Sequence, residues 1–166
     1  MSIWKQLFGD GQRIEERVEP RPSGSFDEEF RWLSAFVGGS DSVLRSALGA
    51  HNDADGAWVW FESVHASFCV ADDGRVIRIS VPTVDAFGHR LTEANTRYLL
   101  GGVRPGMTKA QVRDLWGEPS SGNYDDHAWR YDQKASRTRC GAFAVPILSF
   151  GVESELLESF EARLKG

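Results

Sequence analysis

Histidine and cysteine are the residue types in this chain best suited to bind a metal or to act as base and nucleophile. The chain has four histidines and two cysteines: His51, His65, His89, His127, Cys69 and Cys140. Metal sites place such residues at short fixed spacings, as in CxxC or HExxH, and none of those spacings occurs here. We therefore predict no metal, no cofactor and no catalytic residue. Cys69 and Cys140 are either free thiols or one disulfide.

Two acidic turns are the next candidates for chemistry. Asp53 and Asp55, in Asn-Asp-Ala-Asp-Gly, begin like a calcium-binding loop, but the ligand pattern that ends in glutamate is incomplete. We interpret this segment as a plain turn. Asp125 precedes His127 in a second polar turn, and the chain has no GxSxG elbow, phosphate loop or GxGxxG motif. An enzyme remains an alternative only if the fold gathers Asp125, His127 and Cys140 in one pocket.

Aromatic residues in two strand-like segments are the clearest candidates for function. Trp58-Val59-Trp60 and Trp129-Arg130-Tyr131 contain the residue types that dominate hot spots of protein interfaces. Alternate residues of a strand face opposite sides of a sheet, and exposed apolar patches mark interaction sites. We predict that the partner-binding residues are Trp58, Trp60, Tyr124, Trp129, Arg130 and Tyr131. The alternative is that four of these residues fill the core beneath the helices: Trp58, Trp60, Trp129 and Tyr131.

Composition narrows the class of protein in which these residues act. The 166 residues are 41% hydrophobic and 26% charged, as in ordinary globular domains, and the net charge is −5. Binding to nucleic acid needs a basic stripe, so we expect no nucleic-acid partner. No apolar run approaches the roughly 20 residues of a membrane span. The first residues show no secretory signal, and we therefore expect a cytoplasmic location.

Residues 1–24 are predicted to form a short helix followed by a linker. The apolar residues of the helix fall on one helical face: Ile3, Trp4, Leu7 and Phe8. The polar residues that follow contain the Pro and Gly typical of a linker. We expect the helix to pack on its own domain. Weak contact of residues 3–8 with a membrane surface or a partner is the alternative.

An internal repeat organises the rest of the chain. A constant offset of 68 residues pairs Ser40 with Thr108 and Gly49 with Gly117. Ser and Thr are good helix N-caps, and Gly is the preferred residue where a helix ends in a left-handed conformation. Apolar residues at helical spacing lie between these signals in both copies. The pattern therefore predicts two equivalent helices, each preceded by another helix, over residues 25–33 and 92–100.

The strands of the repeat follow a slightly different offset. A shift of 71 residues aligns Trp58 with Trp129, Cys69 with Cys140, and residues 76–79 with 147–150. These segments are rich in aromatic and β-branched residues, which favours strands. Asp72-Asp73-Gly74 lies between two of them and is typical of a hairpin turn. An amphipathic stretch over residues 153–164 predicts a closing helix.

These elements predict an α+β fold made of a tandem ααβββ repeat, with helix pairs packed on one face of an antiparallel sheet. The expected organisation is a short helix and linker over residues 1–24, a first repeat over 25–90, and a second repeat with a C-terminal helix over 91–166. Equivalent packing of Cys69 and Cys140 is expected from their alignment.

The second copy resembles a known family. The run Val103-Arg-Pro-Gly-Met-Thr-Lys-Ala-Gln-Val-Arg-Asp-Leu-Trp-Gly-Glu-Pro119, followed by Trp129-Arg-Tyr131, is similar to the SmpA/OmlA domain of small outer-membrane lipoproteins. The doubled arrangement resembles the β-lactamase inhibitor protein (BLIP) fold. The resemblance covers residues 92–151 and, more weakly, 25–81. It implies helices on one face of an antiparallel sheet and a function in protein binding without catalysis.

We therefore expect a protein-binding module, in the first place an inhibitor or immunity-type protein that neutralises a toxin or an enzyme. A scaffold or assembly factor related to the outer-membrane lipoprotein domains is the first alternative. A binder of small ligands or an enzyme is the second. The sequence leaves open the identity of the partner and the face of the sheet that stays exposed.

Overall fold

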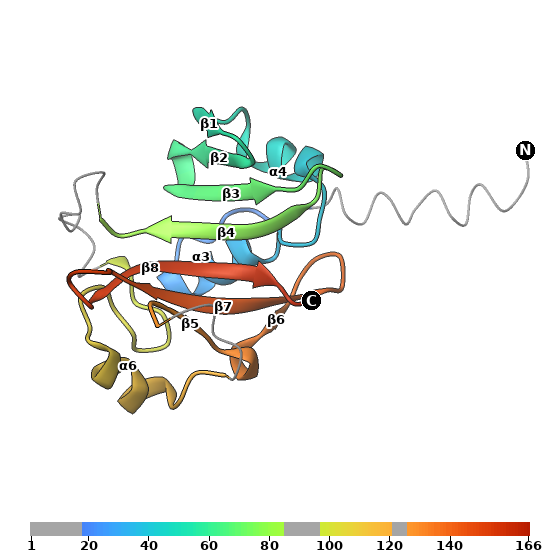
Figure 1. Ribbon diagram of the computed structural model, residues 1–166. Helices are drawn as coiled ribbons and strands as arrows, with labels where there is room; N and C mark the ends of the chain where they lie inside the picture. The colour runs from blue at the N-terminus through green and yellow to red at the C-terminus, as the bar shows by residue number, and fades with distance from the viewer. Residues whose placement is uncertain (1–17, 85–96, 121–125) are drawn as a thin grey trace, which may run out of the picture.

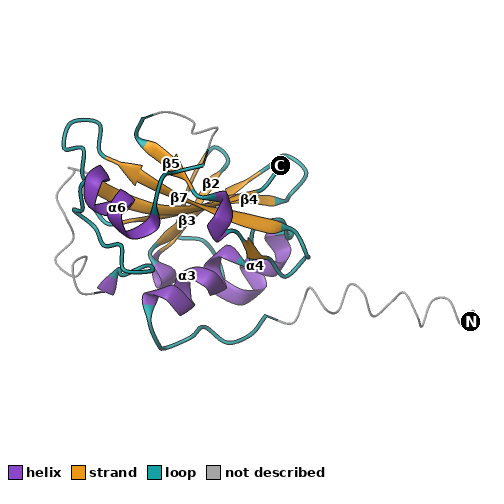
Figure 2. Cartoon of the chain, turned by 90° about the horizontal axis from the view of Figure 1, so that it is seen from below, coloured by secondary structure: helices purple, strands orange, loops and turns teal. Residues whose placement is uncertain are grey.

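The computed structural model describes residues 18–84, 97–120 and 126–166. An eight-stranded sheet is its centre, with the strand order β1-β2-β3-β4-β8-β7-β5 and with β6 paired to β7 beside this path. Each pair of neighbouring strands is antiparallel. Helices α3 and α4 lie behind the sheet in Figure 1, and the view from below in Figure 2 shows both on the same side of it. The predicted combination of helices with an antiparallel sheet is confirmed.

The chain passes through the sheet in two successive halves. The first half contains α3 (Phe26–Ser34), α4 (Asp41–Leu48), β1 (Asp53–Asp55), β2 (Trp58–Phe61), the short 3-10 helix η1 (Glu62–Val64), β3 (Ala66–Val70) and β4 (Val76–Pro82). The second half contains α6 (Lys109–Trp116), β5 (Ala128–Arg130), η2 (Asp132–Lys134), β6 (Ser136–Arg137), β7 (Phe143–Phe150) and β8 (Leu157–Leu164). The predicted helix over residues 92–100 and the N-terminal helix of residues 3–8 fall mainly or wholly outside the described residues.

The two helices of the predicted repeat begin and end where their capping residues indicate. Thr108 caps α6 by accepting a hydrogen bond from the backbone N–H of Gln111, whose side chain accepts in return from the Thr108 N–H. Ser40 precedes α4 in the same way, although its hydroxyl bonds to Ser42 instead of to the helix. Gly49 and Gly117 end the two helices with φ of +80°.

The predicted closing helix over residues 153–164 is wrong, because this segment contains the strand β8. Leu157, Phe160 and Leu164 are spaced as on one face of a helix, and the apolar pattern therefore fits both structures. Backbone pairing decides between them. β8 pairs with β4 on one side and with β7 on the other, and context of this kind overrides local preference.

The strand alignment in the second half is also corrected. In the first half Phe68 pairs with Val59 and with Ile79. In the second half Leu148 occupies the corresponding place, paired with Trp129 and with Phe160. By place in the strand order, β7 therefore corresponds to β3 and β8 to β4, and the predicted tandem ααβββ arrangement is not confirmed. The predicted match of residues 147–150 with 76–79 is displaced by one strand.

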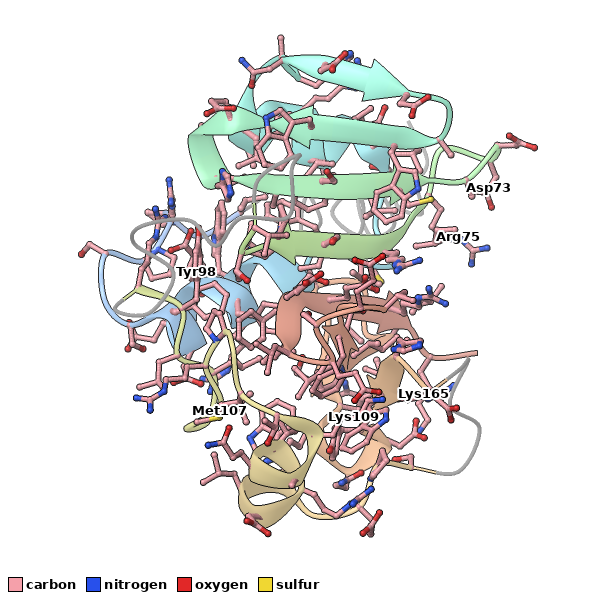
Figure 3. All side chains as sticks on the ribbon, turned by 60° about the vertical axis from the view of Figure 1, so that its left-hand side comes forward. Asp73, Arg75, Tyr98, Met107, Lys109 and Lys165 are labelled. Atoms are coloured by element: carbon pink, nitrogen blue, oxygen red, sulfur yellow. The ribbon has the colours of Figure 1, made fainter. Side chains whose placement is uncertain are left out.

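The pairing of β4 with β8, which we call the β4–β8 seam, joins the two halves into one sheet. Beneath it, Phe160 contacts the rings of Phe26 and Phe30 on α3, with centroids 5.3 and 6.4 Å apart. Tyr98 lies at the N-terminal end of α3 (Figure 3), where its ring centroid is 4.9 Å from that of Phe26. A helix from the first half thus covers a strand of the second, so the halves share one hydrophobic core.

Candidate partner-binding surface

The helices cover one face of the sheet. Trp129, Leu148 and Phe160 are cross-strand neighbours and therefore share a face. Phe160 packs under α3, while Arg113 of α6 lies over the Trp129 ring at 5.1 Å. α3 and α6 consequently lie on the same side, which is also the side of α4 (Figure 2).

The opposite face, which we call the open face, carries two rows of side chains across the sheet. Their members are set by the cross-strand pairs and by alternation along each strand. One row runs through Trp60, Ser67, Ser80, Glu161, Ile147 and Arg130. The other runs through Trp58, Cys69, Arg78, Arg163 and Val145.

Two tryptophans form the β2 end of the open face. Trp58 and Trp60 are both half-buried, so part of each indole is accessible. The Arg78 guanidinium lies over the Trp58 ring at 5.1 Å. The Trp60 Nε1–H donates to Glu62 at 2.8 Å, and the His65 ring meets the Trp60 ring edge-on at 4.9 Å. These contacts hold both rings in defined orientations, which lowers the entropy lost when a partner binds.

Charged groups occupy the middle of the open face at the β4–β8 seam. Arg78 and Arg163 are directly opposite each other on the two strands. Glu161 forms an ion pair with Arg78 and accepts a hydrogen bond from the Ser149 hydroxyl at 3.2 Å. Only 5% of Glu161 is exposed, so its carboxylate is held in one position at the seam.

On the β7 side of the seam, the open face carries apolar side chains that are shielded from solvent. Val145 and Ile147 on β7 are buried, although no α-helix of the described residues lies over this face. Their cross-strand neighbours include long charged side chains, Arg163 beside Val145 and Arg130 beside Ile147. Such side chains cover apolar surface with their methylene groups. Arg130 also forms an ion pair with Asp132 at 2.7 Å.

The edge of the sheet beside the tryptophans is acidic. β1 is three residues long, and its exposed Asp53 and Asp55 pair with Trp60 and Trp58. The Asp53 carboxylate also accepts the Ala54 N–H at 2.8 Å. A short edge with charged side chains resists pairing with strands of other chains. A partner is therefore expected to contact the face of the sheet instead of extending its edge.

The predicted binding residues divide between the two faces. Trp58, Trp60 and Arg130 lie on the open face. Trp129 and Tyr131 lie on the helix-covered face, with exposures of 5% and 0%, so the core alternative holds for these two. The structural counterpart of Trp129 is Val59, not Trp58, and this shift of one residue changes the face. Tyr124 lies outside the described residues.

The side chain of Tyr131 is fully buried between α6 and the sheet. It meets the Trp116 ring edge-on at 5.1 Å, and its hydroxyl donates to the Gly117 carbonyl at 3.2 Å. Burial raises the pKa of the Tyr131 hydroxyl to about 12, although the positive charge of Arg113 acts in the opposite direction. Tyr131 therefore anchors the end of α6 to the sheet.

The residues considered for chemistry are widely separated. Both thiols are free: Cys69 is half-buried on the open face, and Cys140 is exposed in the loop before β7. The equivalent packing predicted for them is therefore wrong. His127 lies at the far end of β7, where its carbonyl accepts from the Phe150 N–H. With about 3.3 Å per residue of strand, β7 holds His127 and Cys140 well apart. Asp125 lies outside the described residues.

Sequence reasoning missed three members of the open face, Arg78, Glu161 and Arg163. For Arg78 the alternation Val76-Ile77-Arg78-Ile79-Ser80 was an available signal, because a lone charge in an apolar strand indicates a polar face. Glu161 and Arg163 were hidden by the helical interpretation of residues 153–164. The exposed side chains of Leu99 and Leu115 were also missed.

Residues 96–140 match the family model described as the outer membrane protein assembly factor BamE domain. The match spans α6, β5 and β6 and agrees with the predicted resemblance to small outer-membrane lipoprotein domains. It favours the assembly-factor alternative and gives no support to an inhibitor of a toxin or an enzyme. The predicted cytoplasmic location is contradicted, because the matched family is named for assembly at the outer membrane.

Two solved structures are similar in outline. A DUF4309 family protein (YjgB) from Bacillus subtilis subsp. subtilis str. 168 has 14% identity and a TM-score of 0.45, over 76% of this chain and 78% of that one. An extracellular protein containing a SCP domain from Bacillus anthracis str. Ames has 11% identity and a TM-score of 0.42, over 89% of this chain and 48% of that one. No curated protein matches the sequence. Within residues 18–84, 97–120 and 126–166, no helix has the length and apolarity needed to cross a membrane.

Proposed function

We propose that this chain is an assembly factor of the bacterial cell envelope that binds another protein and performs no catalysis. The match of residues 96–140 to an outer membrane protein assembly factor domain supports the setting. The continuous sheet formed across the β4–β8 seam supports a role in binding, since none of the α-helices in residues 18–84, 97–120 and 126–166 lies over its open face.

The observation that carries the proposal is the position of Trp58 and Trp60. Both are partly accessible on the open face, whereas the α-helices of the described residues pack on the other. Tryptophan and arginine are enriched in binding hot spots, and here each is held in place before a partner arrives. The contact residues we propose are Trp58, Trp60, Arg78 and Arg130. Trp129 and Tyr131 support the fold beneath them.

The charge of the face constrains the partner. Asp53, Asp55 and Glu62 surround the tryptophans, while the seam beside them carries Arg78 and Arg163. A partner that fits must place cationic side chains over the tryptophan end and acidic ones toward the seam. Complementary charge of this kind sets orientation and association rate more than affinity.

Site-specific photo-crosslinking in cells tests the proposal. A photoreactive amino acid replaces Trp60 in one variant and Arg130 in another, and the control position is Arg45, an exposed residue on α4. We expect both open-face positions to give an adduct with the same envelope protein and Arg45 to give none. Equal adducts from Arg45, or none from the open face in a folded and expressed chain, would refute the assignment.

Subcellular fractionation of the same cells tests the setting separately. The proposal requires the chain in the envelope fraction. A chain found only in the cytosol, with an adduct from Trp60 to a cytosolic protein, would retain the binding face and reject the envelope role.

A further inference from the structure

A pocket of about 240 Å³ lies on the helix-covered side of the sheet, away from the open face. It is bounded by α3, by the turn at Gly101, by the end of α6 and by β6, β7 and β8. Elements of both halves of the chain contribute to it. The proposed function makes no use of this pocket.

The pocket exists because the residues that form its floor have small side chains. Ala144 and Pro146 on β7 and Ala162 on β8 line it, and Pro146 and Ala162 are cross-strand partners on the face toward the helices. Elsewhere on this face Leu148 and Phe160 fill the corresponding layer. Phe30 and Leu100 add apolar side chains to this lining, and Ser34 and Ser136 add polar ones.

The rim is held by interlocking contacts from four segments. The Lys134 ammonium lies over the Trp116 ring at 4.5 Å, and the Trp116 Nε1–H donates to the Gly101 carbonyl at 2.9 Å. The Gly101 N–H donates to the Asp27 carboxylate at 2.8 Å. The rim is therefore preformed, as is usual for sites that bind small molecules.

The charge at the mouth is positive. Arg31 and Lys134 both line the pocket, and neither forms an ion pair with a carboxylate among the described residues. Asp27, the acidic residue of the lining, already accepts the Gly101 N–H. Two cations without ionic partners are notable in a chain of net charge −5, and they favour an anionic ligand.

We propose that this pocket binds a small amphiphilic carboxylate, with its apolar body on the floor of Ala144, Pro146 and Ala162 and its carboxylate between Arg31 and Lys134. An apolar cavity of about 150 Å³ already accepts benzene. The larger volume here suits a short acyl chain or a single ring. The site is independent of the open face, and either proposal can fail without the other.

Binding is measured by calorimetry on the full chain with three probes that share one chain length: octanoate, octanol and octylamine. We expect saturable binding of octanoate, roughly tenfold weaker binding of octanol and weaker binding still of octylamine, because a charge-assisted contact strengthens only the first. Equal affinity for the three, or no saturable binding of octanoate, would overturn the proposal.

Variants locate the site. Lys134→Gln is expected to weaken octanoate binding part of the way toward the level of octanol, since Arg31 remains, and to leave octanol unchanged. Arg45→Gln, which removes a cation on α4, serves as the matched control and is expected to change neither. Ser136→Phe adds a ring to the lining of the pocket and is expected to abolish binding of both probes. Each variant is first shown to be folded by its melting temperature. Octanoate binding that persists in folded Ser136→Phe would place the ligand elsewhere and reject this pocket.

Discussion

Arg78 and Glu161 form an ion pair that links the two halves of the chain across the open face of the sheet. Arg78 lies on the last strand of the first half and Glu161 on the last strand of the second. On the other face of the same strands, Phe160 packs against α3. The β4–β8 seam is thus held by a charged contact above and by aromatic packing below.

Removing one member of this ion pair is expected to cost more stability than removing both. Glu161→Ala leaves Arg78, which lies opposite Arg163, without its carboxylate partner, and the expected loss is about 3 kcal/mol. The double variant Arg78→Met, Glu161→Leu is expected to lie within about 1 kcal/mol of the native chain. Urea unfolding of the two variants checks this. A double variant less stable than Glu161→Ala would show that the loss of stability comes from losing the ion pair itself, and not from leaving the charge of Arg78 unpaired.

Replacing tryptophans on the two faces should separate folding from binding. Trp129→Ala opens a cavity under α6 and is expected to cost about 3–5 kcal/mol of unfolding free energy. Trp60→Ala is expected to cost about 1 kcal/mol, since its ring is only partly buried, and to weaken binding of the crosslinked partner. Chemical denaturation combined with a binding assay gives both numbers. Similar stability losses would contradict the assignment of faces.

Gly101 and Gly56 form a matched pair for testing the rim of the pocket. Their φ angles are +54° and +58°, so alanine is strained at both, by about 1–2 kcal/mol. A Cβ at Gly101 would also lie 3.1 Å from Trp116 Nε1, whereas nothing lies within 4 Å at Gly56. Gly101→Ala is therefore expected to lose about 1 kcal/mol more than Gly56→Ala. Equal losses in thermal unfolding would mean that the Trp116 ring moves away freely.

Alkaline pH should weaken the fold through Tyr131. Its pKa is raised to about 12 in the folded chain, against 10.0 for an ordinary tyrosine. The folded state thus holds a proton that the unfolded state loses first. The contribution of this proton to the free energy of unfolding is complete below pH 10. It is lost as the pH rises toward 12, and the loss amounts to at most about 2 kcal/mol. Unfolding free energies of the native chain and of Tyr131→Phe across this range check the effect, since the variant should lose less stability over it.

Helices α4 and α6 could be predicted from sequence because their signals are local. Ser40 and Thr108 before the helices and Gly49 and Gly117 after them act through contacts within a few residues. Their positions in the structure agree with the prediction. The presence of an antiparallel sheet with helices on one side followed from the same repeat.

The strands of the second half could not be aligned from sequence because their register depends on distant partners. Trp129 looked equivalent to Trp58 by residue type, yet it pairs with Leu148 as Val59 pairs with Phe68. One residue of shift moves a side chain through the sheet. This shift placed two core aromatics in the predicted binding surface, and the misinterpreted residues 153–164 concealed the charges at its centre.

The position of β8 has a consequence for how the chain acquires its structure. Residues 157–164 come last along the described chain but lie in the middle of the sheet, between β4 and β7. Until they are available, β4 and β7 each present an unpaired edge, and the pairing of β4 with β8, which joins residues far apart in the sequence, forms slowly. A chain still emerging from the ribosome, or halfway through a translocation pore, therefore cannot complete its fold. It stays accessible to chaperones until residues 157–164 have emerged and can pair with β4 and β7.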